Sequence, residues 1–190
     1  AFSAHGKRAF IMSHVLDMTG APIVLVSAVP VLRSMGYEVL VLGPSDGGSL
    51  HLFLDAGASV ITRSSCRNVS DAWGMALCAD FVIANTVVMA RAVRALSGTA
   101  VPVLWWLHDA FAGYPHIAHQ IPTQLGENVR VYSVGSHAAN AMHAVRPEFE
   151  IRPLIYGLPD YAAENFVRTD LGYNLSLIHI SEPTRRRGIS

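Results

Sequence analysis

The segment VLWWLHDAF, residues 103–111, places a histidine and a carboxylate directly after an apolar run. Residues 103–107 suit a buried strand, whereas His108 and Asp109 can donate, accept or hold protons. Ligands of parallel α/β sheets bind beyond the carboxyl ends of the strands, so this pair stands where chemistry is usually placed. We therefore predict that His108 and Asp109 are catalytic residues. The alternative is a loop or helix-cap histidine whose ring nitrogens are satisfied by ordinary hydrogen bonds.

Three further small or polar residues stand at predicted strand ends. Gly20 follows the first strand, where a residue without a side chain lets a ligand approach the backbone. Asn85 ends another strand, and Ser136 follows a later one, where its hydroxyl can cap the next helix or bind a ligand. We include all three as binding candidates. Each of these residues also has a purely structural interpretation. Gly20 would then be part of the turn from a loop into a helix, Ser136 would cap the helix that it precedes, and Asn85-Thr86 would end a strand and cap the next helix.

No metal or cofactor signature accompanies these residues. The chain lacks the GxGxxG and Walker A motifs that bind phosphates, and it lacks the GxSxG motif of serine hydrolases. The segment HIAH, residues 116–119, offers two histidines without a third ligand, and Cys66 and Cys78 form no CxxC pair. The adjacent Trp105 and Trp106 are interpreted as packing residues. We predict that the protein needs no metal and no cofactor.

Continuous apolar runs alternate with helical segments along the chain. Such runs are typical of strands in a parallel sheet that helices cover on both faces. The predicted fold class is α/β, with a doubly wound, mostly parallel Rossmann-like sheet. The predicted strands are residues 8–14, 37–44, 58–62, 80–85, 101–107, 129–134 and 151–157. The predicted helices are residues 21–36, 47–57, 69–79, 86–98, 117–125 and 136–145.

Composition limits the partners and the compartment. Of the 190 residues, 51% are hydrophobic and 15% are charged, which suffices for a packed core, and the formal net charge is zero. A neutral chain offers no electrostatic basis for binding nucleic acid. The longest apolar stretch is interrupted by Pro30 and is too short to span a bilayer, and no signal-peptide pattern opens the chain. We predict a cytoplasmic protein without a nucleic-acid partner or a transmembrane segment.

The C-terminal residues 175–187, LSLIHISEPTRRR, resemble the translation of a transposase adapter used in preparing DNA sequencing libraries. The resemblance covers the eleven consecutive residues LSLIHISEPTR. A natural basic tail is the alternative. We interpret residues 175–190 as a non-native tail that takes no part in the fold. The natural protein is then expected to continue beyond Asn174.

The order of several segments resembles the N-terminal domain of family-4-type retaining glycosyltransferases, which have the GT-B fold. The resemblance begins with SHVLDMTGAPIVLVSAVPVLRSMGYEVLVLGP and continues with VPVLWWLHDA, VYSVGSHAANAM and IYGLPD. It extends over about residues 7–161. Each motif alone is weak, and their order and spacing carry the resemblance. Tyr156 departs from the pattern, because the family usually has asparagine before this glycine.

This resemblance implies two Rossmann-like domains that face each other across a cleft. Residues 1–161 would form the N-terminal, acceptor-side domain and residues 162–174 the start of an interdomain linker, while the donor-binding C-terminal domain would be missing. The intact enzyme would transfer a sugar from a nucleotide-sugar donor to a glycan or lipid-linked acceptor with retention of anomeric configuration. The fragment would be inactive alone. A lipid-linked acceptor would allow peripheral contact with the inner membrane face.

The resemblance also implies roles for the candidate residues. His108 would lie near the reacting sugar, where it could hydrogen-bond the sugar or support the leaving group. Asp109 would orient the imidazole or its loop. Thr19 and Gly20 would line the acceptor side and approach the phosphates. The remaining cleft candidates are Ser136 and Gly157.

Other functions are compatible with the same predicted fold, which alone does not choose among them. One is a stand-alone module that binds a sugar or nucleotide without turnover. Another is a GT-B-like enzyme such as a nucleotide-sugar epimerase, which would need acid–base carboxylates among Asp17, Asp46 and Asp109. A nicotinamide-dependent oxidoreductase is disfavoured by the missing glycine fingerprint.

Overall fold

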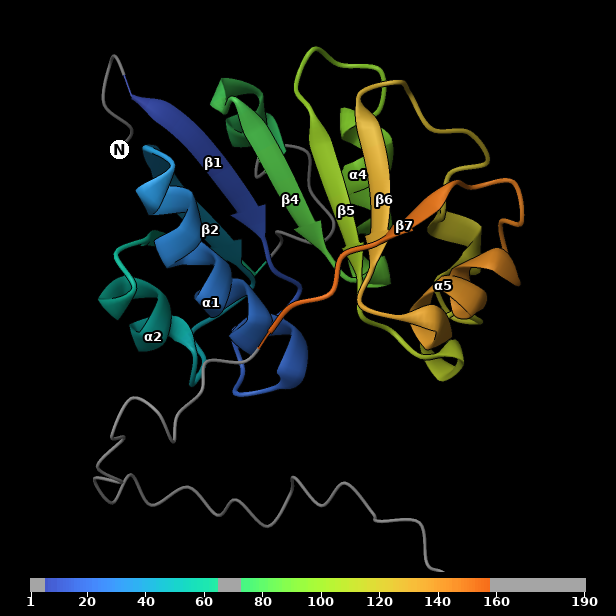
Figure 1. Ribbon diagram of the computed structural model, residues 1–190, viewed down its shortest axis with the longest axis horizontal. Helices are drawn as coiled ribbons and strands as arrows, with labels where there is room; N and C mark the ends of the chain where they lie inside the picture. The colour runs from blue at the N-terminus through green and yellow to red at the C-terminus, as the bar shows by residue number, and fades with distance from the viewer. Residues whose placement is uncertain (1–5, 65–72, 158–190) are drawn as a thin grey trace, which may run out of the picture. The chain divides into compact units, whose positions relative to one another are not determined.

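The computed structural model describes residues 6–64 and 73–157, and in this part of the chain the strands form one sheet (Figure 1). The sheet has seven strands in the order β3-β2-β1-β4-β5-β6-β7, and every neighbouring pair in the described part is parallel. The prediction of a doubly wound α/β sheet is therefore confirmed. The strands are β1 (Lys7–Met12), β2 (Tyr37–Gly43), β3 (Ser59–Thr62), β4 (Phe81–Asn85), β5 (Val103–Leu107), β6 (Val129–Ser133) and β7 (Ile151–Pro153).

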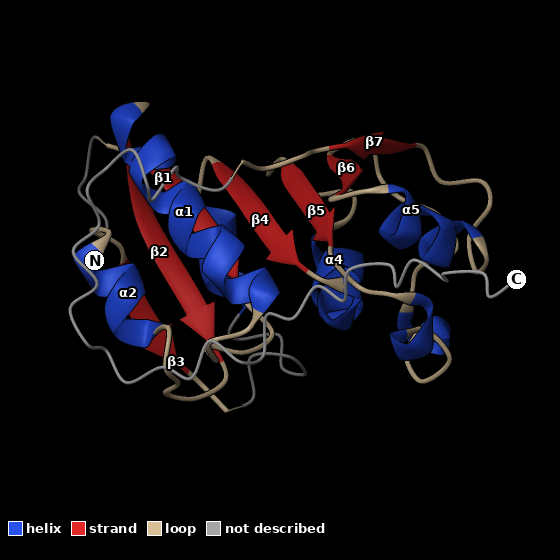
Figure 2. Cartoon of the chain, turned by 60° about the horizontal axis from the view of Figure 1, so that its bottom comes forward, coloured by secondary structure: helices blue, strands red, loops and turns tan. Residues whose placement is uncertain are grey.

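Helices follow most of the strands and run back along the sheet (Figure 2). In the described part of the chain, three α-helices end before a glycine with positive φ, as their sequences predict: φ is 86° at Gly36, 92° at Gly57 and 80° at Gly98. The α-helices are α1 (Gly20–Ser34), α2 (Leu50–Asp55), α4 (Ala90–Leu96) and α5 (Ser136–His143). The 3-10 turns are η1 (Met75–Cys78), η2 (Val87–Met89), η3 (Phe111–Gly113) and η4 (Ala118–Gln120).

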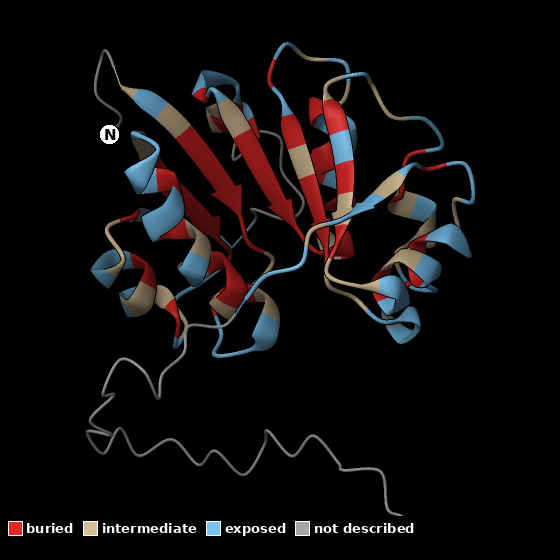
Figure 3. Ribbon diagram, in the orientation of Figure 1, coloured by how far each residue is buried: buried red, intermediate tan, exposed pale blue. Residues whose placement is uncertain are grey.

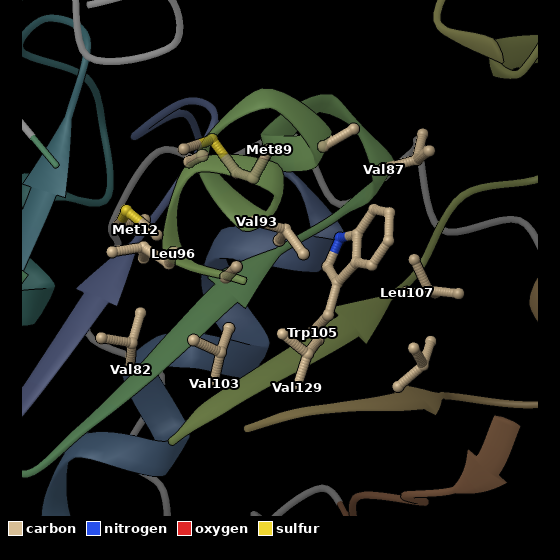
Figure 4. Packing of buried hydrophobic residues seen from close by; sticks show 14 of the residues in the cluster. Met12, Val82, Val87, Met89, Val93, Leu96, Val103, Trp105, Leu107 and Val129 are labelled. Carbon is tan, nitrogen blue, oxygen red and sulfur yellow. The ribbon is translucent and has the colours of Figure 1, made fainter. Parts of the chain in front are cut away.

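The sheet separates two apolar layers, and its central strands are buried on both faces (Figure 3). Residues of α1 and α2 pack on one face together with Trp106. Residues of α4 and α5 pack on the other face around Trp105, and Figure 4 shows part of this second layer. Adjacent residues of a strand point to opposite faces, so the two neighbouring tryptophans enter different layers. Both are buried, as the sequence predicts.

The chain reverses its direction of winding between β1 and β4. β2 and β3 extend the sheet on one side of β1, and β4 to β7 extend it on the other. In doubly wound sheets, ligands bind beyond the carboxyl ends of the strands beside such a switch point. The residues that follow β1, β4 and β5 therefore lie at the position expected for a site.

Some predicted elements are shorter than expected. The helix predicted at residues 117–125 is wrong: this segment contains only the turn η4, since Pro122 lacks a backbone N–H and disfavours helical backbone at the residue before it. The last strand ends at Pro153 rather than at residue 157. The predicted helix 69–79 falls partly on residues 65–72, outside the described residues, and its end forms the turn η1.

The C-terminal predictions also fall outside the described part of the chain. Up to Tyr156 the described residues belong to one compact unit. A domain boundary at residue 161, a linker at 162–174 and a non-native tail at 175–190 all concern undescribed residues and remain predictions. Within the described ranges, the helices are too short or too polar to cross a lipid bilayer.

Candidate functional site

The site is built where β1, β4 and β5 end. Asn85 is the last residue of β4 and pairs in register with Trp106 of β5, while His14 and His108 follow β1 and β5. The rings of Trp106 and His108 lie 4.9 Å apart, centroid to centroid. His14 is close enough to His108 to affect its ionisation. The sheet thus gathers these side chains beside the switch point.

The His108 imidazole is largely buried and stays uncharged at neutral pH. Burial, with a smaller contribution from His14, lowers the pKa of His108 to about 4. A neutral imidazole has one donor nitrogen and one acceptor nitrogen, whereas an imidazolium has two donors and a positive charge. His108 can therefore bind hydroxyl groups or oxygen atoms by hydrogen bonds, but it does not supply a cation at pH 7.

Asp109 binds backbone rather than the neighbouring ring. Its Oδ2 accepts a hydrogen bond from the Val87 N–H at 2.6 Å. Burial raises the pKa of the Asp109 carboxyl, and hydrogen bonds from the backbone of Val87, Asp109 and His108 oppose that rise. Of the two roles expected for Asp109, this geometry fits the orientation of the loop. The carboxylate ties the turn after β4 to the loop after β5.

Thr86, in that same turn, has an unusual backbone conformation. Its φ is 71° and its ψ 167°, a region that β-branched residues rarely adopt and that costs roughly 1–3 kcal/mol. Neighbouring groups hold it there: the Thr86 carbonyl accepts a 2.8 Å hydrogen bond from Trp105 Nε1, and its N–H donates to the Trp106 carbonyl at 2.8 Å. The Thr86 hydroxyl also accepts from the Val88 N–H at 3.3 Å, as expected of a cap. Three hydrogen bonds therefore hold a strained turn next to the site.

Several buried polar atoms of the site make no hydrogen bond. They include both amide atoms of Asn85, Trp106 Nε1, His108 Nε2 and the Tyr114 hydroxyl. Buried polar groups are normally paired, and an unpaired one costs roughly 1–3 kcal/mol. The Asp109 carboxylate influences Tyr114, whose pKa is raised first by burial and then by that charge. Unpaired buried groups therefore gather around the ends of β4 and β5.

The other predicted binding residues are more exposed. Thr19 is the N-cap of α1, but its hydroxyl makes no capping bond, and a Cβ placed on Gly20 would contact no atom within 4 Å. Ser136 begins α5 after the cap residue Gly135, so its predicted capping role is not observed. Gly157 is exposed and is the last described residue before the C-terminus. Hydrogen bonds of the described residues join none of these four to His108 or Asp109.

Sequence reasoning did not assign a site role to three aromatic or imidazole side chains that the structure places here. His14 shows no ligand pattern in the sequence, Trp106 reads as a core residue, and Tyr156 appears only as a departure from a family motif. In the structure the Tyr156 ring lies 6.2 Å from the Trp106 ring and 6.4 Å from the His108 ring. The position of His14 at the end of the predicted strand 8–14 was the one signal that could have included it.

Metal ligands do not gather in the described part of the chain. Within residues 6–64 and 73–157, no three side chains of histidine, cysteine, aspartate or glutamate lie together as a metal site requires. Two surface cavities are lined by no candidate site residue: one of about 460 Å³ beside β2, β3 and η1, and one of about 400 Å³ beside β6 and β7. The candidate site is defined by its buried polar groups.

Comparison with known proteins gives a family and a fold. Residues 5–148 match the family model described as Glycosyl-transferase family 4. No curated protein sequence matches significantly. Solved structures of similar fold include HepE of Anabaena in complex with UDP and glucose, at 16% identity and a TM-score of 0.59 over 81% of this chain and 45% of that one.

Two further structures share the fold. MurG of Acinetobacter baumannii is 13% identical, with a TM-score of 0.51 over 86% of this chain and 50% of that one. An alpha-glucosyltransferase in complex with UDP-glucose and DNA containing an abasic site is 11% identical, with a TM-score of 0.52 over 78% of this chain and 42% of that one. The present chain thus matches about half or less of each of these structures.

Proposed function

The chain belongs to glycosyltransferase family 4, and from this premise we propose that the intact enzyme transfers a sugar from a nucleotide-sugar donor to an acceptor with retention of anomeric configuration. The family match over residues 5–148 is the observation that carries the proposal. In this reaction the bond between the anomeric carbon and the diphosphate breaks. A new bond to an acceptor hydroxyl forms on the same face of the sugar, and the acceptor proton is released.

We propose that this chain supplies the acceptor-side half of the site. The match to about half the length of similar structures supports this assignment. Residues 1–161 would be the N-terminal domain, 162–174 the start of a linker and 175–190 a tail without a role. A second Rossmann-like domain would bind the nucleotide. The 190 residues alone would then be inactive, because reacting groups must be held together for transfer.

The neutral His108 suggests a specific part in this reaction. An oxocarbenium-like transition state and a departing diphosphate gain most from fixed hydrogen bonds and dipoles. His108 would donate or accept a hydrogen bond at the sugar or at the leaving oxygen, without adding a positive charge. Asp109 would keep the loop of His108 in place through the backbone of Val87.

Thr19 and Gly20 are proposed to face the diphosphate. The open space over Gly20 and the unused hydroxyl of Thr19 support this role, because N–H groups at a helix start attract anions. Asn85, Ser136 and Gly157 would contribute to the acceptor side. No metal or cofactor is needed in this scheme. A glycan or lipid-linked acceptor, a cytoplasmic location and peripheral membrane contact belong to the proposal as well.

The test uses the enzyme expressed to its natural C-terminus. His108→Ala is expected to lower kcat about a hundred- to a thousandfold with little change in Tm, because one preorganised hydrogen bond to the transition state is lost. His51→Ala, on the exposed surface of α2, is the matched control. NMR of the product reports the anomeric configuration. Unchanged turnover with a lowered Tm in His108→Ala would refute the role of His108, and an inverted product would refute retention.

A further inference from the structure

The loop between β1 and α1 is held in place at Leu16. β1 and β2 are neighbours in the sheet, so the segments that follow them leave it at the same edge (Figure 1). There the Leu16 carbonyl accepts two hydrogen bonds from Ser49, one from its backbone N–H at 2.8 Å and one from its hydroxyl at 2.7 Å. Leu16 and Ser49 are both buried. The segment after β2 therefore fixes the loop that follows β1.

The Ser49 hydroxyl does not have the role that serine usually has at this position. Ser49 is the N-cap residue of α2, and the side chain of an N-cap serine usually accepts a hydrogen bond from an N–H in the first turn of its own helix. The Ser49 hydroxyl makes no such bond. It donates instead to Leu16, a residue 33 positions earlier in the chain. The helix goes without this cap, and the hydroxyl serves the neighbouring loop.

Three glycines of the same segment leave room for this loop. A Cβ on Gly47 would collide with the Leu16 carbonyl, whose carbon would lie at 2.6 Å, and a Cβ on Gly43 would lie 2.5 Å from the Leu16 side chain. A Cβ on Gly48 would lie 2.6 Å from the side chain of Met18. None of the three glycines has a positive φ. The close approach of the loop, rather than an unusual backbone conformation, therefore requires glycine here.

Thr19 and Gly20 stand at the end of the loop that is held in this way. Thr19 is the N-cap residue of α1 and Gly20 its first residue, and two residues separate Thr19 from Leu16. The beginning of the loop is bonded as well, because the Ser13 N–H donates to the Leu42 carbonyl at 2.9 Å. N–H groups at a helix start bind an anion only where they point at it, so the position of the loop decides how well they bind.

We propose that Gly47 and Ser49 are positioning residues, which hold the loop before α1 so that Thr19 and Gly20 are in place for the diphosphate of the donor. The inference deepens the proposed function and rests on the assignment of Thr19 and Gly20 to the diphosphate. Gly47 and Ser49 touch no substrate in this scheme and act through the Leu16 carbonyl. If these contacts only stabilised the fold, their loss would lower the folded fraction and leave donor binding by the remaining enzyme unchanged.

The structure gives the size of the expected effect. In Gly47→Ala, relieving the contact with the Leu16 carbonyl carbon moves the loop by about 0.8 Å, and a displacement of about 1 Å can lower a rate about a hundredfold. Ser49→Ala removes one of the two hydrogen bonds to Leu16 and leaves the bond from the Ser49 N–H, so its effect should be smaller.

The first test measures kinetics of the enzyme expressed to its natural C-terminus, well below the Tm of every variant. For the nucleotide-sugar, kcat/KM is expected to fall about a hundredfold in Gly47→Ala and about tenfold in Ser49→Ala. The donor KM should rise, and the acceptor KM should stay within about twofold of the wild type. Ser49→Thr keeps the hydroxyl donor and is expected to recover most of the activity that Ser49→Ala loses.

Two matched control variants change comparable groups elsewhere in the chain. Gly74→Ala adds a methyl group before η1, where a Cβ would have no atom within 4 Å. Thr99→Val, at the amino end of the sheet, removes a hydroxyl that donates to the Leu96 carbonyl at 2.7 Å. Both variants are expected to leave the two KM values unchanged, even where the Tm falls.

The second test measures the loop without any substrate, by hydrogen–deuterium exchange of the 190-residue chain. The amides of residues 14–20 are expected to exchange severalfold faster in Gly47→Ala and Ser49→Ala than in the wild type. Amides of β6 should keep their exchange rates in the same variants. A general loss of stability would speed exchange in both places.

The outcomes separate the positioning role from the proposed function. Faster exchange confined to the loop, together with a raised donor KM, supports the positioning role. Unchanged exchange of residues 14–20, or an unchanged donor KM in Gly47→Ala, overturns it even where the enzyme transfers sugar. A full-length enzyme that transfers no sugar refutes the proposed function, and loop-confined exchange in that protein would still support the hold of Gly47 and Ser49 on the loop.

Discussion

Two asparagines of this chain should respond oppositely to the same substitution. Asn128 Nδ2 donates to the carbonyls of Leu96 and Val101, and its Oδ1 accepts from the Gly98 N–H at 2.8 Å. The Asn85 amide is buried and makes no hydrogen bond. Leucine has nearly the shape of asparagine, so Asn128→Leu and Asn85→Leu both remove polar atoms with little change in volume.

The hydrogen bonds give the expected magnitudes. Asn128→Leu loses three short hydrogen bonds of about 1 kcal/mol each and a longer one, of 3.4 Å, to the Thr99 hydroxyl, so the free energy of unfolding should fall by about 2–4 kcal/mol. The partial exposure of the site favours the lower part of that range. Asn85→Leu loses none and relieves an unpaired buried amide. Its free energy of unfolding should stay unchanged or rise by about 1–2 kcal/mol.

Urea unfolding of the 190-residue chain, followed by tryptophan fluorescence, measures both variants. Equal m-values would show that the two unfolding reactions expose similar surface, so that the free energies can be compared. The reasoning is refuted if Asn85→Leu destabilises the chain as much as Asn128→Leu. Asn85 would then be a structural residue with partners of its own, and its burial would need no ligand.

Two further predictions concern Asp109 and His108. Asp109→Ala should lower the free energy of unfolding by about 1–3 kcal/mol because the Val87 N–H loses its acceptor. Asp109→Asn keeps an acceptor and should cost less than about 1 kcal/mol. Thermal unfolding compares the two variants, and equal losses of stability would contradict the role of Asp109 in the loop. The folded-state pKa of His108 is lowered to about 4 from 6.5, so the unfolded chain binds the proton more readily than the folded chain. The neutral His108 therefore stabilises the folded chain fully above pH 6.5, and this stabilisation is lost as the pH falls towards 4. Over that interval the free energy of unfolding of the wild type should fall by on the order of 3 kcal/mol through this histidine, and His108→Gln should lack this fall. Urea unfolding at several pH values measures both proteins. Parallel pH profiles of the two would refute the buried, neutral histidine.

Much of the fold was predictable because each element carries its own local signal. Continuous apolar residues such as 39–42 suit a strand covered on both faces, and Gly36 and Gly98 mark the helix ends that precede a turn. The segment 117–125 was mispredicted because its apolar content outweighed Pro122, which restricts it to a short 3-10 turn. The sequence predicts an element reliably where the spacing of its apolar residues and the positions of its turn residues indicate the same helix or strand.

The position of the candidate site was predictable from the sequence, but the hydrogen bonds between its residues were not. Alternating strands and helices place the ends of all parallel strands at one edge, so the sequence already puts Asn85 and His108 there. The bond from the Val87 N–H to Asp109 joins residues that are 22 positions apart, and no spacing rule links them. The role of the carboxylate in the loop therefore emerges only from the folded chain.

The pair Trp105-Trp106 separates what the sequence determines from what tertiary structure decides. An apolar run of strand length determines that both indoles are buried, and the alternation of side chains along a strand determines that they enter opposite layers. Whether a buried N–H finds an acceptor depends on the backbone that the neighbouring strand brings to it. The carbonyl of Thr86, held in a strained turn after β4, meets Trp105 Nε1, and no acceptor meets Trp106 Nε1. Two identical neighbours in the sequence thus become a structural tryptophan and a candidate ligand-binding one, because hydrogen bonds are made between elements that only folding brings together.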